Sequence, residues 1–284
     1  MIPAAFDYYR PKDMAGVLSL LEEHGDDARV MAGGHSLIPM MKLRMADVPH
    51  LIDLQDIEGM SDIDIGSDAI KIGAMVTQAQ IIDSAELLAV APILREAALQ
   101  IADPQIRYMG TVGGNVANGD PGNDMPGLMQ CLDATFTVVG ADGERDIPAR
   151  EFYEAAYMTA REDEELLTGV TIPLPKGGYA YEKQKRKIGD YATAAAAVQI
   201  VRDGNVCASA SIAMTNLSDT PIYSEDAGAA LVGTVVDDAA LAAAVTAMLG
   251  DIDPADDNRG PIAFKNHLAG VILRRAITRA WSRA

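Results

Sequence analysis

The chain has 284 residues, of which 49% are hydrophobic and 23% are charged, enough for two modest domains with hydrophobic cores. Its 41 acidic and 23 basic side chains give a formal net charge of −18. A field of that sign repels nucleic-acid phosphates and anionic lipid headgroups, so neither is an expected partner. The two cysteines and four histidines are scattered without metal-ligand spacing, so we expect no metal site in this chain. Any redox chemistry then needs an organic cofactor or a metal held by another chain.

Targeting and membrane signals are weak. The first ten residues lack a basic flank followed by an apolar run, which argues against a signal peptide. The most apolar stretches, such as 192–201, are far shorter than the roughly 20 residues that a membrane span needs. We therefore expect a cytoplasmic protein without a membrane span.

The first half of the chain predicts alternating short strands and helices. Asp13 is typical of a helix N-cap, and Gly25 ends that helix. Strands are predicted over 29–32 and 51–54, on either side of a glycine-rich loop. The next elements are a hairpin over 63–72, a helix capped by Thr77, one long helix over 87–101, and strands over 135–139 and 166–172.

A linker and a smaller unit follow. The pair Pro173 and Pro175, followed by two glycines, is the best linker candidate. Strands over 194–202 and 206–215 bracket a Gly/Asn turn, which predicts a hairpin. Helices are predicted over 237–249 and 268–284. We therefore divide the chain into an α+β domain over 1–175, with subdomains of about 1–55 and 56–175, and a C-terminal α+β domain over 178–284.

Two glycine-rich loops, each following a strand-like run, carry the strongest functional signal. Paired glycines allow positive φ and lack a Cβ, so consecutive backbone N–H groups can converge on one anion such as a pyrophosphate. A flanking hydroxyl in each loop adds a donor. Neither loop matches the G-x-G-x-x-G turn or the G-x-x-x-x-G-K-[ST] loop. Because a Gly-Gly pair is often only a tight turn, the residues alone leave both a cofactor site and two plain turns open. The loops consist of Ala32, Gly33, Gly34, His35 and Ser36, and of Thr111, Val112, Gly113, Gly114 and Asn115.

These loops, the G-D-P-x-N-D-x-P segment over 119–126 and the K-R-K-I-G-D-Y-A-T-A segment over 185–194 carry a resemblance. The chain resembles the FAD-binding medium subunits of the molybdenum hydroxylases (the xanthine dehydrogenase family), most of all those of aerobic carbon monoxide dehydrogenases. The resemblance covers essentially the whole chain. It implies an α+β fold, in which a two-part FAD-binding domain of the vanillyl-alcohol-oxidase-like (PCMH) type precedes a small C-terminal domain with helices on an antiparallel sheet.

The resemblance also implies FAD contacts at single positions. The two loops would hold the pyrophosphate and ribityl region, Asp124 would accept hydrogen bonds from sugar or ribityl hydroxyls, and Tyr191 would cover one flavin face. On the residues alone, Asp124 is equally a solvated turn carboxylate and Tyr191 is more often a core aromatic. Further cofactor contacts are implied at Ile101, Leu167 and Lys183, with Lys185 and Lys187 close enough to Lys183 to compete for its role.

The function that the resemblance implies is electron transfer. FAD in this chain would collect electrons from two [2Fe–2S] clusters of a small subunit and pass them to a quinone or NAD. A large subunit with a molybdopterin cofactor would oxidise the substrate, which this chain does not specify, in a heterohexamer built as a dimer of heterotrimers. Flavin chemistry needs no protein nucleophile, so no residue is assigned a catalytic role. Two alternatives stay open: a stand-alone flavoenzyme resembling an enolpyruvyl reductase, and a non-redox binding module.

Overall fold

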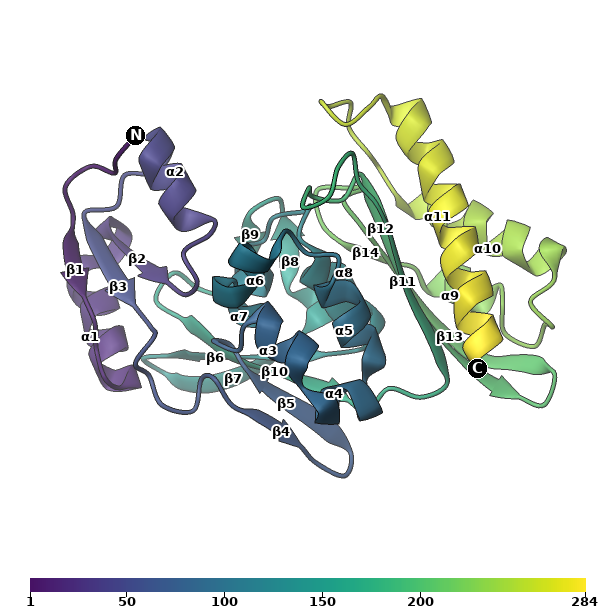
Figure 1. Cartoon of the computed structure of the whole chain (residues 1–284), viewed down its shortest axis with the longest axis horizontal. Helices are drawn as coiled ribbons and strands as arrows, with labels where there is room; N and C mark the ends of the chain where they lie inside the picture. Colours follow the sequence, from purple (N-terminus) through teal and green to yellow (C-terminus); the bar gives the residue numbers. More distant parts are fainter.

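The computed structural model describes every residue from Met1 to Ala284, and the chain forms an α+β structure with sheets placed side by side (Figure 1). Its sheets are a three-stranded, a five-stranded, a four-stranded and a two-stranded one. Along the chain, the three-stranded and the five-stranded sheet come before residue 175, and the four-stranded sheet comes after it. None of the helices combines the length and apolar character that crossing a membrane requires.

The N-terminal unit is a parallel sheet in the order β1-β3-β2. The predicted cap is confirmed, because the Asp13 carboxylate accepts a hydrogen bond from the N–H of Gly16 at 2.8 Å. Gly25 ends the helix as expected and donates its N–H to the carbonyl of Leu21. The elements are β1 (Asp7–Tyr9), α1 (Met14–His24), β2 (Ala28–Met31), α2 (Leu37–Leu43) and β3 (His50–Asp53).

The second unit is built on an antiparallel sheet in the order β4-β5-β10-β6-β7. The predicted hairpin over 63–72 and the strands near 135–139 and 166–172 are confirmed. Strand β7 was not predicted, because it lacks the apolar face that identifies a strand in a sequence. It is an edge strand in which all residues except Ile147 are exposed. The strands are β4 (Ile63–Ile65), β5 (Ala69–Gly73), β6 (Thr135–Gly140), β7 (Gly143–Pro148) and β10 (Leu166–Pro173), with a separate pair β8 (Tyr153–Ala155) and β9 (Met158–Thr159).

Six short helices accompany this sheet. The prediction of one helix over 87–101 is wrong, since Pro92 has no N–H and forces Ala91 out of the helical region (φ −143°, ψ 59°). Two helices therefore form, with Pro92 as the first residue of the second. The six are α3 (Gln78–Asp83), α4 (Ala85–Val90), α5 (Pro92–Ala98), α6 (Pro104–Met109), α7 (Val112–Ala117) and α8 (Asp124–Cys131).

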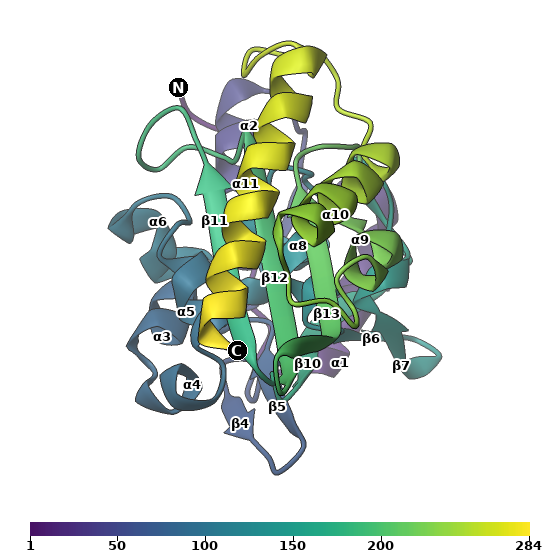
Figure 2. The same cartoon turned by 90° about the vertical axis from the view of Figure 1, so that its right-hand side faces the viewer.

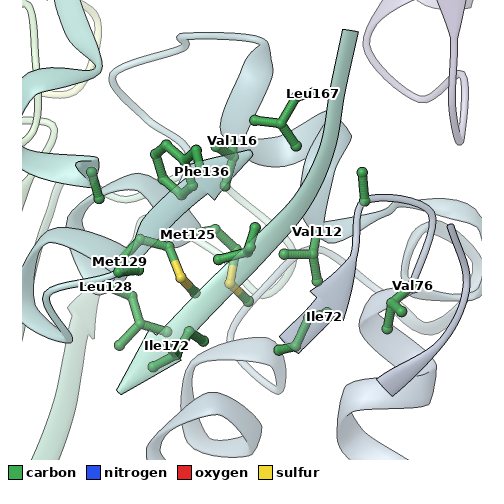
Figure 3. Packing of buried hydrophobic residues seen from close by; sticks show 14 of the residues in the cluster. Ile72, Val76, Val112, Val116, Met125, Leu128, Met129, Phe136, Leu167 and Ile172 are labelled. Carbon is green, nitrogen blue, oxygen red and sulfur yellow. The ribbon is translucent and has the colours of Figure 1, made fainter. Parts of the chain in front are cut away.

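The core of the second unit lies between the sheet and helices α7 and α8 (Figure 3). Every residue of α8 is buried, which is unusual for a helix of only eight residues and marks it as the centre of the packing. The labelled side chains come from three strands and from these helices and segments next to them: Ile72, Val76, Val112, Val116, Met125, Leu128, Met129, Phe136, Leu167 and Ile172.

The C-terminal part is an antiparallel sheet in the order β11-β12-β13-β14, with helices on one face. Figure 2 shows α11 lying along that face, with α10 and α9 beside it. The hairpin predicted over 194–215 is confirmed, and the terminal helix begins at Ile262, six residues before the predicted start at 268. The elements are β11 (Gly178–Gln184), β12 (Ala194–Asp203), β13 (Val206–Thr215), β14 (Ile222–Tyr223), α9 (Glu225–Ala229), α10 (Asp238–Asp251) and α11 (Ile262–Arg283).

Strand β12 is buried on both faces, and the alanines at its start alternate between the two cores. Ala195 and Ala197 belong to the core that contains α8, whereas Ala194 and Ala196 belong to the core formed with α10 and α11. Successive side chains of a strand point to opposite faces, so small residues let α8 and α11 approach the sheet from both sides. The first core therefore continues past residue 175 into the C-terminal sheet, while the division into domains at 175 and 178 stays a prediction.

This packing predicts that Ala197→Leu destabilises the protein by about 1–3 kcal/mol, because three added carbons have no space in a closed core. Thermal unfolding of the full chain measures the change. Val235→Leu is the matched control, since Val235 is 53% exposed and the larger side chain there meets solvent. An Ala197→Leu protein as stable as the control would contradict the sealed packing of β12 against α8.

Candidate functional site

A cleft of about 1010 Å³ brings the predicted FAD contacts together. This volume lies at the upper end of the usual range for ligand sites, about 300–1,000 Å³. Its walls come from the N-terminal unit, the helices of the second unit, the start of β10 and the segment that follows β11. Every residue predicted to contact FAD lines the cleft except Val112, which is 1% exposed and packs in the core instead.

The first glycine loop offers unpaired main-chain donors. The N–H groups of Gly33, Gly34, His35 and Ser36 have no acceptor anywhere in the chain. Gly34 has a φ of +73°, and a Cβ there would lie 2.8 Å from the Ile38 side chain, so only glycine suits this position. A run of free N–H groups lining a cleft is a site for an anion. The loop can therefore bind a pyrophosphate as expected.

The second glycine loop differs from the prediction. No strand precedes it, and its residues form the start of α7. Neither Gly113 nor Gly114 has positive φ. The expectation that its main-chain N–H groups are free for an anion holds only for Thr111, because the other four are used inside the chain. Val112 donates to the carbonyl of Val76, Gly113 to that of Ala74, Gly114 to the Thr111 hydroxyl oxygen and Asn115 to the Thr111 carbonyl.

The glycines of both loops allow close backbone approach. A Cβ on Gly33 would lie 2.0 Å from the carbonyl oxygen of Met109, and one on Gly113 would lie 2.7 Å from that of Ala74. A Cβ on Gly114 would lie 3.5 Å from the Cβ of Ala32, so the two loops are neighbours. Larger side chains at Gly33 or Gly113 would therefore disturb the walls of the cleft itself, before any contact with a ligand is considered.

Asp124 is the centre of a buried polar network. Its carboxylate, at the start of α8, accepts hydrogen bonds from the Tyr181 hydroxyl at 2.5 Å and from Lys183 Nζ at 2.7 Å. Burial, followed by the nearby Asp124 charge, holds the pKa of Tyr181 well above its usual range, so the phenol stays a donor. Because both carboxylate oxygens already have protein donors, Asp124 serves first to hold Lys183 in place.

Lys183 is the lysine that lines the cleft. Its side chain is 1% exposed, and Nζ also donates to the carbonyl of Gln100 at 3.2 Å. Lys185 Nζ donates to the main-chain carbonyl and to the side-chain oxygen of Gln100, and Lys185 does not line the cleft. Burial, followed by repulsion from Lys183, lowers the pKa of Lys185. Lys187 is exposed and also lies outside the cleft lining.

Tyr191 lies at the edge of the cleft rather than in a core. It is 43% exposed, and a Cβ on Gly122 would come within 3.0 Å of its ring, so the ring rests on the turn that precedes α8. Its N–H donates to the Asp190 carboxylate at 2.9 Å, and the Arg259 guanidinium lies 5.8 Å from the ring centroid. The interpretation of Tyr191 as a core aromatic is therefore wrong.

The set of residues fits FAD in chemical type. Free N–H groups suit phosphates, buried Ile101 and Leu167 suit an aromatic ring, and the Lys183 ammonium, paired with Asp124, supplies a hydrogen-bond donor. The structure contains no group of three or more His, Cys, Asp or Glu side chains placed to hold a metal ion. Sequence reasoning missed Tyr181, although its spacing of two residues from Lys183 on one strand places both side chains on the same face.

Comparisons with known proteins give the family of the chain. A family model described as "FAD binding domain in molybdopterin dehydrogenase" matches residues 4–175. The chain belongs to this family. A second model, "CO dehydrogenase flavoprotein C-terminal domain", matches residues 179–280. The chain is thus a flavoprotein subunit of the molybdenum hydroxylase type, as the resemblance implied.

Individual relatives are similar over the full length. The chain is 55% identical to the carbon monoxide dehydrogenase medium chain of Afipia carboxidovorans, covering 100% of this chain and 99% of that one. It is 41% identical to the medium chain of Hydrogenophaga pseudoflava, with the same coverage. A solved structure described as reconstituted CO dehydrogenase from Oligotropha carboxidovorans superposes with a TM-score of 0.98 at 55% identity, covering 100% of both chains. Family membership sets aside both alternatives, the enolpyruvyl-reductase-like enzyme and the non-redox module.

The Asp124–Lys183 pair predicts a large effect of removing one partner. Lys183→Met leaves the Asp124 charge buried with Tyr181 alone and is expected to destabilise the fold by about 3–5 kcal/mol. Adding Asp124→Asn removes that charge and should recover part of the loss. Denaturant unfolding of the flavin-free full chain measures both variants.

The control is Arg274→Met, which breaks the exposed pair with Asp238, whose side chain is 98% exposed. Exposed pairs of this kind contribute no more than about 1 kcal/mol. If Lys183→Met proves as mild as Arg274→Met, the pair does not anchor the wall of the cleft.

Proposed function

We propose that the chain binds one FAD in this cleft and transfers electrons within a heteromeric molybdenum hydroxylase that oxidises carbon monoxide. Electrons arrive from the [2Fe–2S] clusters of a small subunit and leave to a quinone or NAD. The observation that carries the proposal is that all but one of the implied FAD contacts, which are spread along the sequence from Ala32 to Tyr191, line one cleft. The 55% identity to a carbon monoxide dehydrogenase medium chain supports the choice of reaction.

The residues of the chain have distinct tasks in this proposal. The free N–H groups of Gly33–Ser36 bind the pyrophosphate, and the second glycine loop forms the opposite side of that site. Lys183, held by Asp124, places an ammonium hydrogen-bond donor at the wall of the cleft. Tyr191 covers the ring system at the edge and limits its contact with solvent. FAD, when bound, supplies the redox chemistry itself, which is why no acid–base pair is needed.

The proposal requires partner chains. An iron–sulfur cluster needs several cysteine thiolates, whereas Cys131 and Cys207 are the only cysteines here and both are buried at 1% exposure. Burial raises the pKa of Cys131 to about 12, which keeps it a thiol. A related solved structure is described as a Cu,Mo-CO dehydrogenase. We infer a large molybdopterin subunit and a small iron–sulfur subunit, assembled as a dimer of heterotrimers.

Purification tests this assembly. The native complex is expected to contain FAD, iron and molybdenum and to reduce a dye with carbon monoxide, while the isolated chain reduces the dye at most slowly with NADH. Elution as a 30.1 kDa monomer from fresh extract would contradict the assembly. Oxidation of carbon monoxide by the isolated, metal-free chain would contradict the electron-transfer role.

The position of Tyr191 predicts a specific variant. Tyr191→Ala is expected to weaken FAD binding by about tenfold at most, since aromatic stacking contributes about 0.5–1.5 kcal/mol. It should also speed the reaction of the reduced flavoprotein with oxygen, because one face is uncovered. Stopped-flow reoxidation and FAD titration measure these effects.

Tyr108→Ala is the control for this variant, because Tyr108 is 67% exposed and lies outside the cleft lining. Both substitutions should leave the melting temperature nearly unchanged, because neither ring belongs to a hydrophobic core. Wild-type reoxidation in Tyr191→Ala would remove this residue from the flavin site.

A further inference from the structure

A buried amide without partners lies in the wall of the cleft. Gln78 is 1% exposed and lines the cleft, and neither Oε1 nor Nε2 has a hydrogen-bond partner. Buried amide groups are almost always paired, because leaving them unpaired costs the loss of their bonds to water. The amide therefore needs a partner that the chain does not provide: a ligand in the cleft or a trapped water.

The backbone fixes Gln78 beside the second glycine loop. Its N–H donates to the carbonyl of Gly110 at 2.9 Å, and the residue before it, Thr77, forms a β-bridge with Thr111. Local capping does not use the Gln78 side chain, since the capping box of α3 is formed by Thr77 and Gln80. The side chain is thus held at the base of a loop that would contact FAD, yet it has no task in the fold.

This loop also offers few main-chain donors for an anion, because only the N–H of Thr111 has no acceptor in the chain. The N–H groups from Val112 to Asn115 are all paired inside the chain, whereas those of Gly33–Ser36 are free. A pyrophosphate bound between the two loops would find four free main-chain donors on the first loop and a single one, that of Thr111, on the second. A neutral side-chain amide at the base of the second loop would supply a further donor on the side that has only one.

We propose that Gln78 is a ligand of the FAD pyrophosphate, with Nε2 donating to a phosphate oxygen and Oε1 accepting from a neighbouring hydroxyl of the cofactor. The proposal rests on the placement of FAD in this cleft. It adds a binding residue outside both glycine loops and explains why a polar side chain is buried without partners in the flavin-free fold.

Gln78→Met tests the proposal, because methionine keeps the length of the side chain and removes both polar atoms. FAD affinity of the full chain, in its native assembly, is expected to fall about tenfold, while the melting temperature of the flavin-free form rises by about 2–5 °C as the unpaired amide disappears. These opposite changes separate a ligand contact from general damage, which would lower both.

Gln130→Met is the matched control. Gln130 is also buried, at 4% exposure, and its Oε1 is also unpaired, but it lies on α8 outside the cleft lining. Its substitution should leave FAD affinity unchanged. Gln78→Glu keeps the shape, loses the donor and adds a charge, so it should weaken FAD binding more than Gln78→Met, and more at pH 8 than at pH 6.

Competition separates the parts of the cofactor. ADP, which carries the pyrophosphate, should bind about tenfold more weakly to Gln78→Met, and riboflavin should bind equally to both proteins. An FAD dissociation constant within twofold of wild type in Gln78→Met overturns the proposal and assigns the amide to a trapped water. Failure of the wild-type chain to bind FAD overturns the proposed function instead.

Discussion

The cleft depends on one buried carboxylate. Asp124 lies at the first turn of α8, in the N-terminal part, and both hydrogen-bond donors that satisfy it lie on β11, in the C-terminal sheet. Removing either donor while the two parts stay packed would leave the carboxylate buried without a full set of partners, which is among the costliest changes a fold can undergo. The wall of the cleft that carries Lys183 is therefore fixed by the same contact that joins the two parts of the chain.

Small residues allow equally close packing in the cleft walls and in the cores behind them. The glycines at 33 and 113 let main chains approach where a Cβ would overlap backbone atoms, and the alanines of β12 let helices pack on both sides of one strand. These contacts are van der Waals and dry, so they have little freedom to adjust. A site framed in this way exists before the ligand arrives, and binding then loses less entropy to ordering of loops.

The sequence predicted the elements whose signals are local. Capping by Asp13 and Thr77, the hairpin around residue 204 and the long C-terminal helices were all found from patterns that act within a few residues. The helices α6, α7 and α8 were missed because they have at most eight residues and are stabilised by tertiary contacts rather than by their own composition. For the same reason the choice among three lysines required the position of Asp124, which is 59 residues away from Lys183 in sequence.

The strongly acidic chain and a diphosphate cofactor are compatible because the two effects act over different distances. The net charge of −18 is spread over the molecule and is screened beyond about 8 Å at physiological salt, whereas N–H donors act at about 3 Å. The cleft also contains Arg29 and Arg161, which donate to main-chain carbonyls and have no carboxylate within ion-pair distance. Their charges are not cancelled by direct ion pairs, as that of Lys183 is by Asp124. The cleft is also lined by carboxylates, among them Asp163 and Glu165 near Arg161, so the two arginines do not make it positive. Local N–H donors, rather than the global field, therefore determine how an anionic ligand is bound.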